Sequence, residues 1–105
     1  MDLVEKVYAI TSTFSSEEKY GLTSQIRRCA VSIPSNIAEG AGRNSNKEFR
    51  HFLGIANGST SELNTQLLLS IRIGYVKLDG LDDIFNLITE IQKINFTLIK
   101  KFSNV

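Results

Sequence analysis

The chain has 105 residues, enough for one compact domain, and its balance of 42% hydrophobic and 22% charged residues excludes an intrinsically disordered protein. A formal net charge of only +1 excludes a protein that is basic over its whole surface, as proteins that wrap nucleic acid are. The single cysteine, Cys29, excludes an intramolecular disulfide. With no signal-peptide pattern and no apolar run long enough to cross a membrane, the sequence predicts a cytoplasmic protein without a membrane partner.

The first expected helix covers residues 2–14. Its apolar side chains recur at intervals of three and four, which is the spacing of one helix face, at Leu3, Val7, Ile10 and Phe14. The polar stretch that follows ends at Gly21, which we expect to separate this helix from the next.

The second expected helix covers residues 23–42 and contains the only proline of the chain, Pro34. An interior proline removes one backbone hydrogen bond and crowds the carbonyl four residues earlier, at a cost of roughly 3 kcal/mol. The apolar stripe nevertheless keeps its phase from Ile26 to Ile37. This continuity favours one helix with a kink near Pro34 over two separate helices.

The third expected helix, residues 46–73, is the longest. Ser45 and Glu48 have the spacing of a capping box at its start, and Gly74 follows its last residue. At about 1.5 Å per residue this helix should be roughly 40 Å long.

The fourth expected helix covers residues 81–102. Aspartates stand at its start and Lys100 and Lys101 at its end, where each charge complements the helix dipole. Because the connections are short, consecutive helices should lie antiparallel. The sequence therefore predicts an all-α protein with a single domain, residues 1–105, folded as an up-down-up-down four-helix bundle.

A second face of the third helix is built from small residues, Gly54, Gly58 and Ser61. Each glycine costs about 1 kcal/mol of helix propensity relative to alanine, so a closely approaching helix should compensate. That helix lies either within the bundle or in a second subunit. We take the three residues as a candidate oligomer interface; the alternative is a monomer with a thick core.

Basic residues gather in the middle of the chain. Between Thr23 and Lys77, seven basic residues accompany three acidic ones, whereas the rest of the chain has an acidic excess. Arginine suits phosphate oxygens because its planar guanidinium presents parallel donors. The candidate nucleic-acid-binding residues are Arg27, Arg28, Arg43, Lys47, Arg50 and Arg72. The alternative is that they form solvated helix faces, paired with acids one turn away.

No catalytic, metal or cofactor site is expected. His51 is the only histidine and has no partners at metal-ligand spacing. Cys29 lies at the edge of an apolar stripe without a second cysteine or a base, so we expect it to pack in the core. Gly40 and Gly42 are not accompanied by the lysine and hydroxyl of a phosphate-binding loop. These observations predict a protein that is not an enzyme.

The segment 21–40, GLTSQIRRCAVSIPSNIAEG, closely resembles a motif of the four-helix bundle proteins encoded in intervening sequences of bacterial large-subunit ribosomal RNA genes. Relatives of that family include the accessory variability proteins of diversity-generating retroelements. The likeness covers nearly the whole chain and continues through the third expected helix, at Arg43-Asn44-Ser45, Phe52-Leu53 and Ser61-Glu62-Leu63.

The resemblance implies a four-helix bundle of a kind often assembled as a ring-like homopentamer, with a positively charged surface for RNA or DNA; no enzymatic activity is established for the family. Arg27, Arg28 and Arg43 match basic positions of the family, and Lys47 is a less specific match. The retroelement relatives imply an alternative, a protein-interaction adaptor that docks a partner such as a reverse transcriptase. The first helix of the family commonly begins further upstream, so we expect a shortened first helix here.

Overall fold

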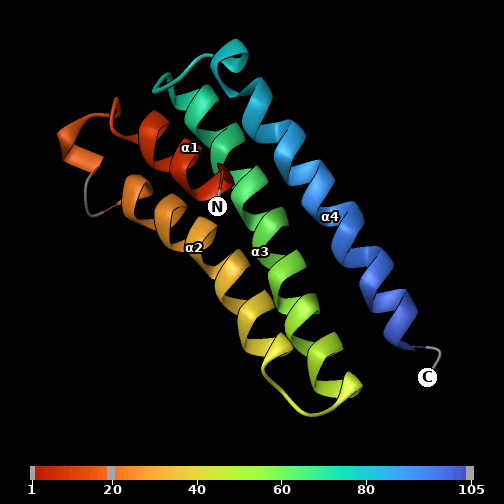
Figure 1. Ribbon diagram of the computed structural model, residues 1–105. Helices are drawn as coiled ribbons and strands as arrows, with labels where there is room; N and C mark the ends of the chain where they lie inside the picture. The colour runs from red at the N-terminus through yellow and green to blue at the C-terminus, as the bar shows by residue number, and fades with distance from the viewer. Residues whose placement is uncertain (1, 19–20, 104–105) are drawn as a thin grey trace.

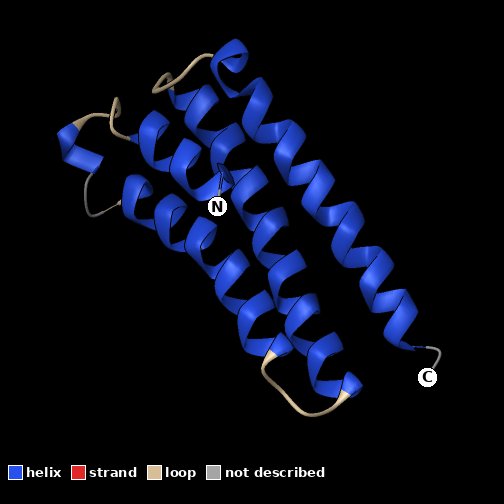
Figure 2. Cartoon of the chain, viewed as in Figure 1, coloured by secondary structure: helices blue, strands red, loops and turns tan. Residues whose placement is uncertain are grey.

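The computed structural model describes residues 2–18 and 21–103, and within them it contains only helices, turns and bends. Four α-helices follow one another along the chain: α1 (Asp2–Thr11), α2 (Leu22–Ala41), α3 (Asn46–Ile73) and α4 (Asp82–Ser103). Two short 3-10 helices lie in the connections, η1 (Ser16–Glu18) and η2 (Leu78–Leu81). The predicted all-α fold with four helices is therefore confirmed (Figure 2).

The helices differ in length, and this gives the molecule an elongated shape. Figure 1 shows α2, α3 and α4 side by side, with consecutive helices running in opposite directions. α1 has 10 residues against 28 in α3, packs on α2 and α4, and covers only one end of the longer helices. The principal extents are 47 × 24 × 19 Å. The far half of the molecule therefore consists of three packed helices rather than four.

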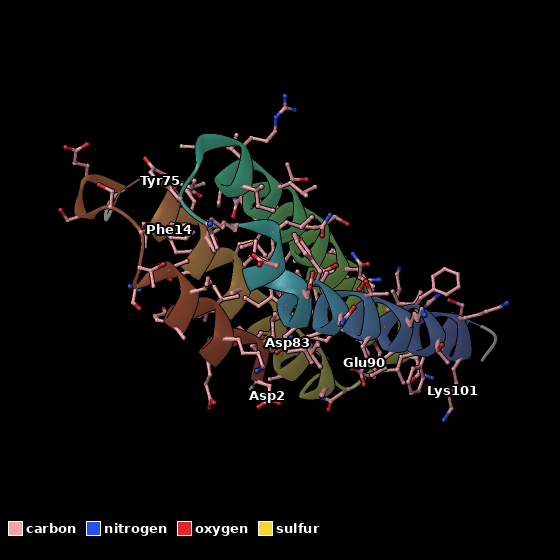
Figure 3. All side chains as sticks on the ribbon, turned by 90° about the horizontal axis from the view of Figure 1, so that it is seen from above. Asp2, Phe14, Tyr75, Asp83, Glu90 and Lys101 are labelled. Carbon is pink, nitrogen blue, oxygen red and sulfur yellow. The ribbon has the colours of Figure 1, made fainter. Side chains whose placement is uncertain are left out.

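The first helix ends at Thr11, so the predicted end at residue 14 is wrong. Consecutive hydroxyl side chains turn back and donate to carbonyls near the helix end: Thr11 to Val7 at 2.7 Å, Ser12 to Ala9 at 2.6 Å, and Thr13 to Ile10 at 2.7 Å. These bonds give the last carbonyls partners without a further helical turn. Phe14 lies just beyond the helix and still packs on Tyr75, with ring centroids 5.5 Å apart (Figure 3).

The other three helices begin and end within one residue of the predicted positions. α2 runs through Pro34 without interruption, so the prediction of one helix rather than two is confirmed; the kink stays a prediction. Gly74 ends α3 with a positive φ of 96°, a backbone conformation that favours glycine.

The start of α3 forms one half of the predicted capping box. Ser45 Oγ accepts a hydrogen bond from the Glu48 backbone N–H at 3.1 Å. The Glu48 carboxylate lies instead 4.0 Å from Arg43 Nε. Among the described residues, the cap is therefore supplied by the serine alone.

α2 and α3 approach closely at Gly40. A Cβ built on Gly40 would lie 2.7 Å from Phe52 Cβ and 3.0 Å from Phe49 Cδ1, well inside the usual separation of nonbonded carbons. From its place in the sequence, Gly40 indicates only the end of a helix. In the structure it is the residue that lets α3 pack against α2.

The core is mostly apolar and includes polar cross-links between α3 and α4. Fully buried side chains from every helix meet in it, among them Leu3, Ile26, Ile33, Leu63 and Ile88. Asn95 is also buried, and its Nδ2 donates to Asn57 Oδ1 at 3.0 Å. One turn away, Gln92 Nε2 donates to Thr60 Oγ1 at 2.9 Å. These bonds fix the register of α4 on α3, because a buried amide without a partner is costly.

Candidate nucleic-acid interface

Arg27 points toward α1 and stabilises the packing of α1 on α2. Its Nε donates to Thr11 Oγ1 at 2.9 Å and its Nη2 to the Tyr8 carbonyl at 3.4 Å. The guanidinium carbon also lies 4.6 Å from the centre of the Tyr8 ring, within the range of a cation–π contact. The side chain is half-buried. Arg27 therefore joins α1 to α2, and only part of its guanidinium faces solvent.

Arg28, the next residue, is exposed beside a groove between α2 and α3. The groove has a volume of about 390 Å³ and is also lined by Gln25, Ser59 and Glu62. Among the described residues, no carboxylate forms an ion pair with Arg28. Its guanidinium is therefore available to a phosphate group.

The two cations at the turn between α2 and α3 differ in their surroundings. Arg43 Nη2 lies 2.6 Å from Glu39 Oε1, and its Nε lies 4.0 Å from Glu48 Oε2. The Arg43 guanidinium carbon is also 5.0 Å from the centre of the Phe52 ring. Lys47 is exposed and has no ion pair in the described ranges. Two carboxylates therefore offset the charge of Arg43, whereas the charge of Lys47 is left uncompensated.

Arg50 and Arg72 lie toward opposite ends of α3. Arg50 is half-buried, and its Nε has no hydrogen-bond partner within the part of the chain that is described. Arg72 is exposed in the last turn of the helix, again with no ion pair to a described residue. The two positions are about 33 Å apart along the axis, at roughly 1.5 Å per residue.

The six candidate residues do not form one continuous patch. Arg28, Lys47 and Arg72 are exposed and without ion pairs within residues 2–18 and 21–103. They are spread over the length of the α2–α3 pair, whereas Arg27 and Arg43 are engaged by their own subunit. A single phosphate therefore cannot reach all three exposed cations.

The small residues of α3 lie on an open face. A Cβ built on Gly54 or Gly58 would meet no neighbouring atom within 4 Å. No other helix of the described chain therefore approaches these glycines, although a close neighbour within the bundle was one of the two expectations. Ser61 is exposed and lines a second groove, between α3 and α4. All three candidate interface residues are uncovered in the single chain.

A further basic segment lies at the end of α4, outside the candidate set. Lys93, Lys100 and Lys101 are exposed, and residues 91–103 contain no acidic residue. Figure 3 shows Lys101 projecting from the end of the helix. Phe96 lies within the same segment and is itself exposed. The sequence shows that this segment lacks acidic residues, but the helix dipole alone explains lysines at the end of a helix. The sequence therefore did not indicate a binding site here. Only the exposure of Phe96 in the structure reveals an uncovered aromatic side chain among the lysines.

Cys29 is buried between α2 and α3, as expected, and its Sγ donates to the Ser59 carbonyl at 3.0 Å. Burial is the main cause that raises the pKa of the thiol to about 11, and the negative charge of Glu62 raises it further. A hydrogen bond with the Leu63 backbone acts in the opposite direction. The thiol is therefore protonated at neutral pH, which suits core packing and not nucleophilic chemistry.

His51 is exposed, and its ring packs edge-on against Phe52 with centroids 5.5 Å apart. Across the described residues, histidine, cysteine, aspartate and glutamate side chains do not come together in groups of three or more that could hold a metal ion. In the same residues, no helix combines the length and the apolar character needed to span a membrane.

The fold and the sequence both match known proteins. The sequence model of the family described as 23S rRNA-intervening sequence protein matches residues 1–97. The chain belongs to this family. The resemblance inferred from residues 21–40 is therefore confirmed, and the 23S rRNA-intervening sequence protein family accounts for nearly all of the chain.

A solved structure supports the same assignment. It is a protein with unknown function from the S23 ribosomal protein family of Bacteroides thetaiotaomicron VPI-5482, with a TM-score of 0.86 and 29% sequence identity. The match covers 94% of this chain and 93% of that chain. No curated protein matches the sequence.

Proposed function

We propose that this member of the 23S rRNA-intervening sequence protein family binds nucleic acid through contacts to phosphate and catalyses no reaction. One observation carries the proposal: Arg28, Lys47 and Arg72 are exposed, and no described carboxylate pairs with them. Cations that neutralise phosphates release counterions, which supplies most sequence-independent affinity. The family description names ribosomal RNA, so RNA is the first ligand to test and DNA the second.

We also propose that the protein assembles into a homo-oligomer, a pentamer by resemblance to its family, through Gly54, Gly58 and Ser61. Small side chains let a helix of a second subunit approach, which would compensate for the helix propensity lost at the glycines. Assembly would add the exposed cations of every subunit to one field, so a chain with a net charge of +1 could attract a polyanion. We also propose that the protein is cytoplasmic, because its one cysteine is unpaired and free thiols are typical of reducing compartments.

Binding is tested by the fluorescence anisotropy of labelled structured RNA, duplex DNA and single-stranded DNA, titrated with the protein at several salt concentrations. Three phosphate contacts predict a slope near −2.7 in log affinity against log salt for a duplex. This slope corresponds to a loss of about 40-fold between about 50 mM and about 200 mM salt. If none of the three ligands binds even at the lowest salt concentration, the proposal is wrong.

A pair of charge reversals shows whether binding uses specific cations. Arg28→Glu should weaken binding to every sequence and reduce the salt slope by about 1 for each subunit that contacts the ligand. Lys6→Glu makes the same change of charge on α1, where Lys6 Nζ lies 4.0 Å from Asp83, and it should leave the slope almost unchanged. Equal effects of the two variants would mean that only the overall charge of the protein matters.

Light scattering tests the assembly. The expected mass is a multiple of the 11.7 kDa chain, and five copies agree with the family resemblance. Gly58→Leu should reduce the mass, because its side chain would occupy the space that a second subunit needs. A wild-type protein of one-chain mass at tens of micromolar would overturn the assembly proposal.

Protein docking is the second candidate function, favoured by apolar side chains exposed near the end of α3. Leu68, Leu69 and Ile73 are 46%, 45% and 51% exposed, and grouped apolar side chains on a surface are typical of contacts with other proteins. Where a reverse transcriptase is encoded beside the gene, co-expression and purification of the two proteins test this role. Leu69→Asp should then abolish the complex and leave RNA binding intact.

A further inference from the structure

Phe96 is the most exposed large apolar side chain among the described residues, with 64% of its surface accessible. It lies on α4 three residues after Lys93 and four residues before Lys100. Residues at these spacings share one face of a helix. The structure thus presents an uncovered aromatic ring between two lysines, one turn away on either side.

The α4 segment that carries this ring is positively charged, and the nearest acidic residue along the helix is Glu90, one turn before Lys93. Residues 91–103 include three lysines and no acidic residue. No ion pair joins Lys93, Lys100 or Lys101 to a carboxylate within the described part of the chain. A polyanion that reaches Phe96 therefore meets uncompensated charge on both sides of the ring.

An open groove of about 370 Å³ adjoins the ring between α3 and α4. Besides Phe96 and Lys93, its lining includes the side chains of Asn57, Thr89 and Gln92. The hydrogen bonds from Asn95 to Asn57 and from Gln92 to Thr60 hold both walls in place. The Asn57 Nδ2 amino group and the Gln92 Oε1 atom have no hydrogen-bond partner among the described residues. The first can donate a hydrogen bond to the edge of a nucleobase, and the second can accept one.

We propose that Phe96, flanked by Lys93 and Lys100, is a stacking site for an unpaired base of a single-stranded nucleic acid. This inference rests on the proposed function and adds the class of ligand. Single-strand sites combine cations that follow the backbone with aromatic rings on which bases stack. The subunit contact proposed through Gly54, Gly58 and Ser61 borders this groove on its α3 side, because Ser61 also lines the groove. At the ring itself a second copy of the chain is a poorer occupant, because lysine is depleted from the centres of protein interfaces.

The site distinguishes a single strand from a duplex. In a duplex, each base already stacks on its neighbours, so its faces are not open to an aromatic side chain. In a loop or a single strand, the base faces are free and the ring can cover one of them. Lys93 and Lys100 are about 10 Å apart along the helix, at roughly 1.5 Å per residue, and they can contact the phosphates on the two sides of the stacked base.

The test compares a labelled oligouridine with a duplex RNA of equal length, each titrated into the full-length wild-type protein and into Phe96→Ala. Phe96→Ala should lower the affinity for oligouridine about tenfold, the effect of losing one base–aromatic stack, and should leave duplex binding unchanged. Leu78→Ala is the matched control, because Leu78 is also exposed but lies in η2, away from the basic end of α4. This variant should bind both RNAs as the wild type does.

A second variant reports on the stack directly. The chain contains no tryptophan, so the emission of Phe96→Trp comes from this position alone, apart from a weaker tyrosine background. Oligouridine should quench this emission at the same concentrations at which it binds, and duplex RNA should not.

Each of the other outcomes would overturn the proposed stacking site. Unchanged oligouridine binding by Phe96→Ala, or an equal loss for both RNAs, overturns the stacking site and leaves the phosphate contacts of α2 and α3 standing. A fall in the mass of Phe96→Ala by light scattering assigns the ring to a subunit contact and also overturns the site. Failure of the wild type to bind either RNA at low salt overturns the proposed function as well.

Discussion

Replacing Gly40 with alanine should destabilise the protein, because the added methyl group would collide with α3. Its carbon would lie 2.7 Å from Phe52 Cβ and 3.0 Å from Phe49 Cδ1. Phe52 Cβ is bonded directly to the backbone of α3, so no rotation of the phenylalanine side chain relieves the first contact. The two helices have to move apart at this point.

Two opposing free energies set the size of the effect. Alanine gains about 1 kcal/mol over glycine in helix propensity. Overpacking of a close contact costs about 1–3 kcal/mol, and a contact of 2.7 Å with an atom that cannot rotate away belongs in the upper part of this range, about 2–3 kcal/mol. The expected net loss is about 1–2 kcal/mol. For a domain of this size, this loss lowers the melting temperature by roughly 5–15 °C.

Thermal and urea unfolding, followed by far-UV circular dichroism, measure this loss. Gly42→Ala is the matched control two residues further along, where the nearest atoms to a new Cβ are carbonyl oxygens at 3.6 Å and φ is −81°. The control should stay within about 0.5 kcal/mol of the wild type. A Gly40→Ala protein as stable as this control would refute the close approach of α2 and α3.

Three further predictions follow from buried polar contacts. Arg27→Ala should lower the free energy of unfolding by about 1–2 kcal/mol because it removes contacts with α1, whereas the exposed Arg28→Ala should change it by less than about 0.5 kcal/mol; equal urea midpoints would contradict this difference. Asn95→Ala should cost about 1–3 kcal/mol by breaking the cross-link to α3, and a loss no larger than that of the exposed Asn86→Ala would count against it. The thiol of Cys29 holds its proton more tightly in the folded state, with a pKa of about 11 against 9.0, so its contribution to stability is complete below pH 9 and is lost as the pH rises to about 11. The difference in stability between the wild type and Cys29→Ala should therefore shrink across this range, and a constant difference would show that the thiol is not shielded.

The helices could be predicted from the sequence wherever periodicity and end signals agree. α3 was predicted to the residue because Ser45 caps its start and Gly74 adopts the left-handed conformation at its end. α1 was predicted too long because Phe14 keeps the apolar spacing although the chain has already left the helix. Periodicity records which side chains are buried, and a residue beyond the helix can be buried too.

The candidate site was less predictable because it depends on which elements meet. Arg27 and Arg28 are adjacent and alike in the sequence, but only Arg27 faces α1. Gly40 and Gly58 are both helical glycines, but only Gly40 has a helix against it. The ion pair between Arg43 and Glu39 agrees with the alternative that acids one turn away pair with the basic residues, because residues four apart on a helix are neighbours.

The amide pair between Asn57 and Asn95 also sets how α4 is rotated about its own axis. Successive residues of a helix point about 100° apart, so anchoring Asn95 inward turns Phe96 toward water. Leucines at both positions 57 and 95 would fill the same space without that anchor, and replacing both partners of a buried polar pair by apolar side chains is often neutral or stabilising. Such a variant could melt later and yet let α4 turn or slip, and its outer surface would then no longer be unique. Thermal stability is for this reason a poor guide to whether an engineered version of this bundle still presents the same face to a ligand.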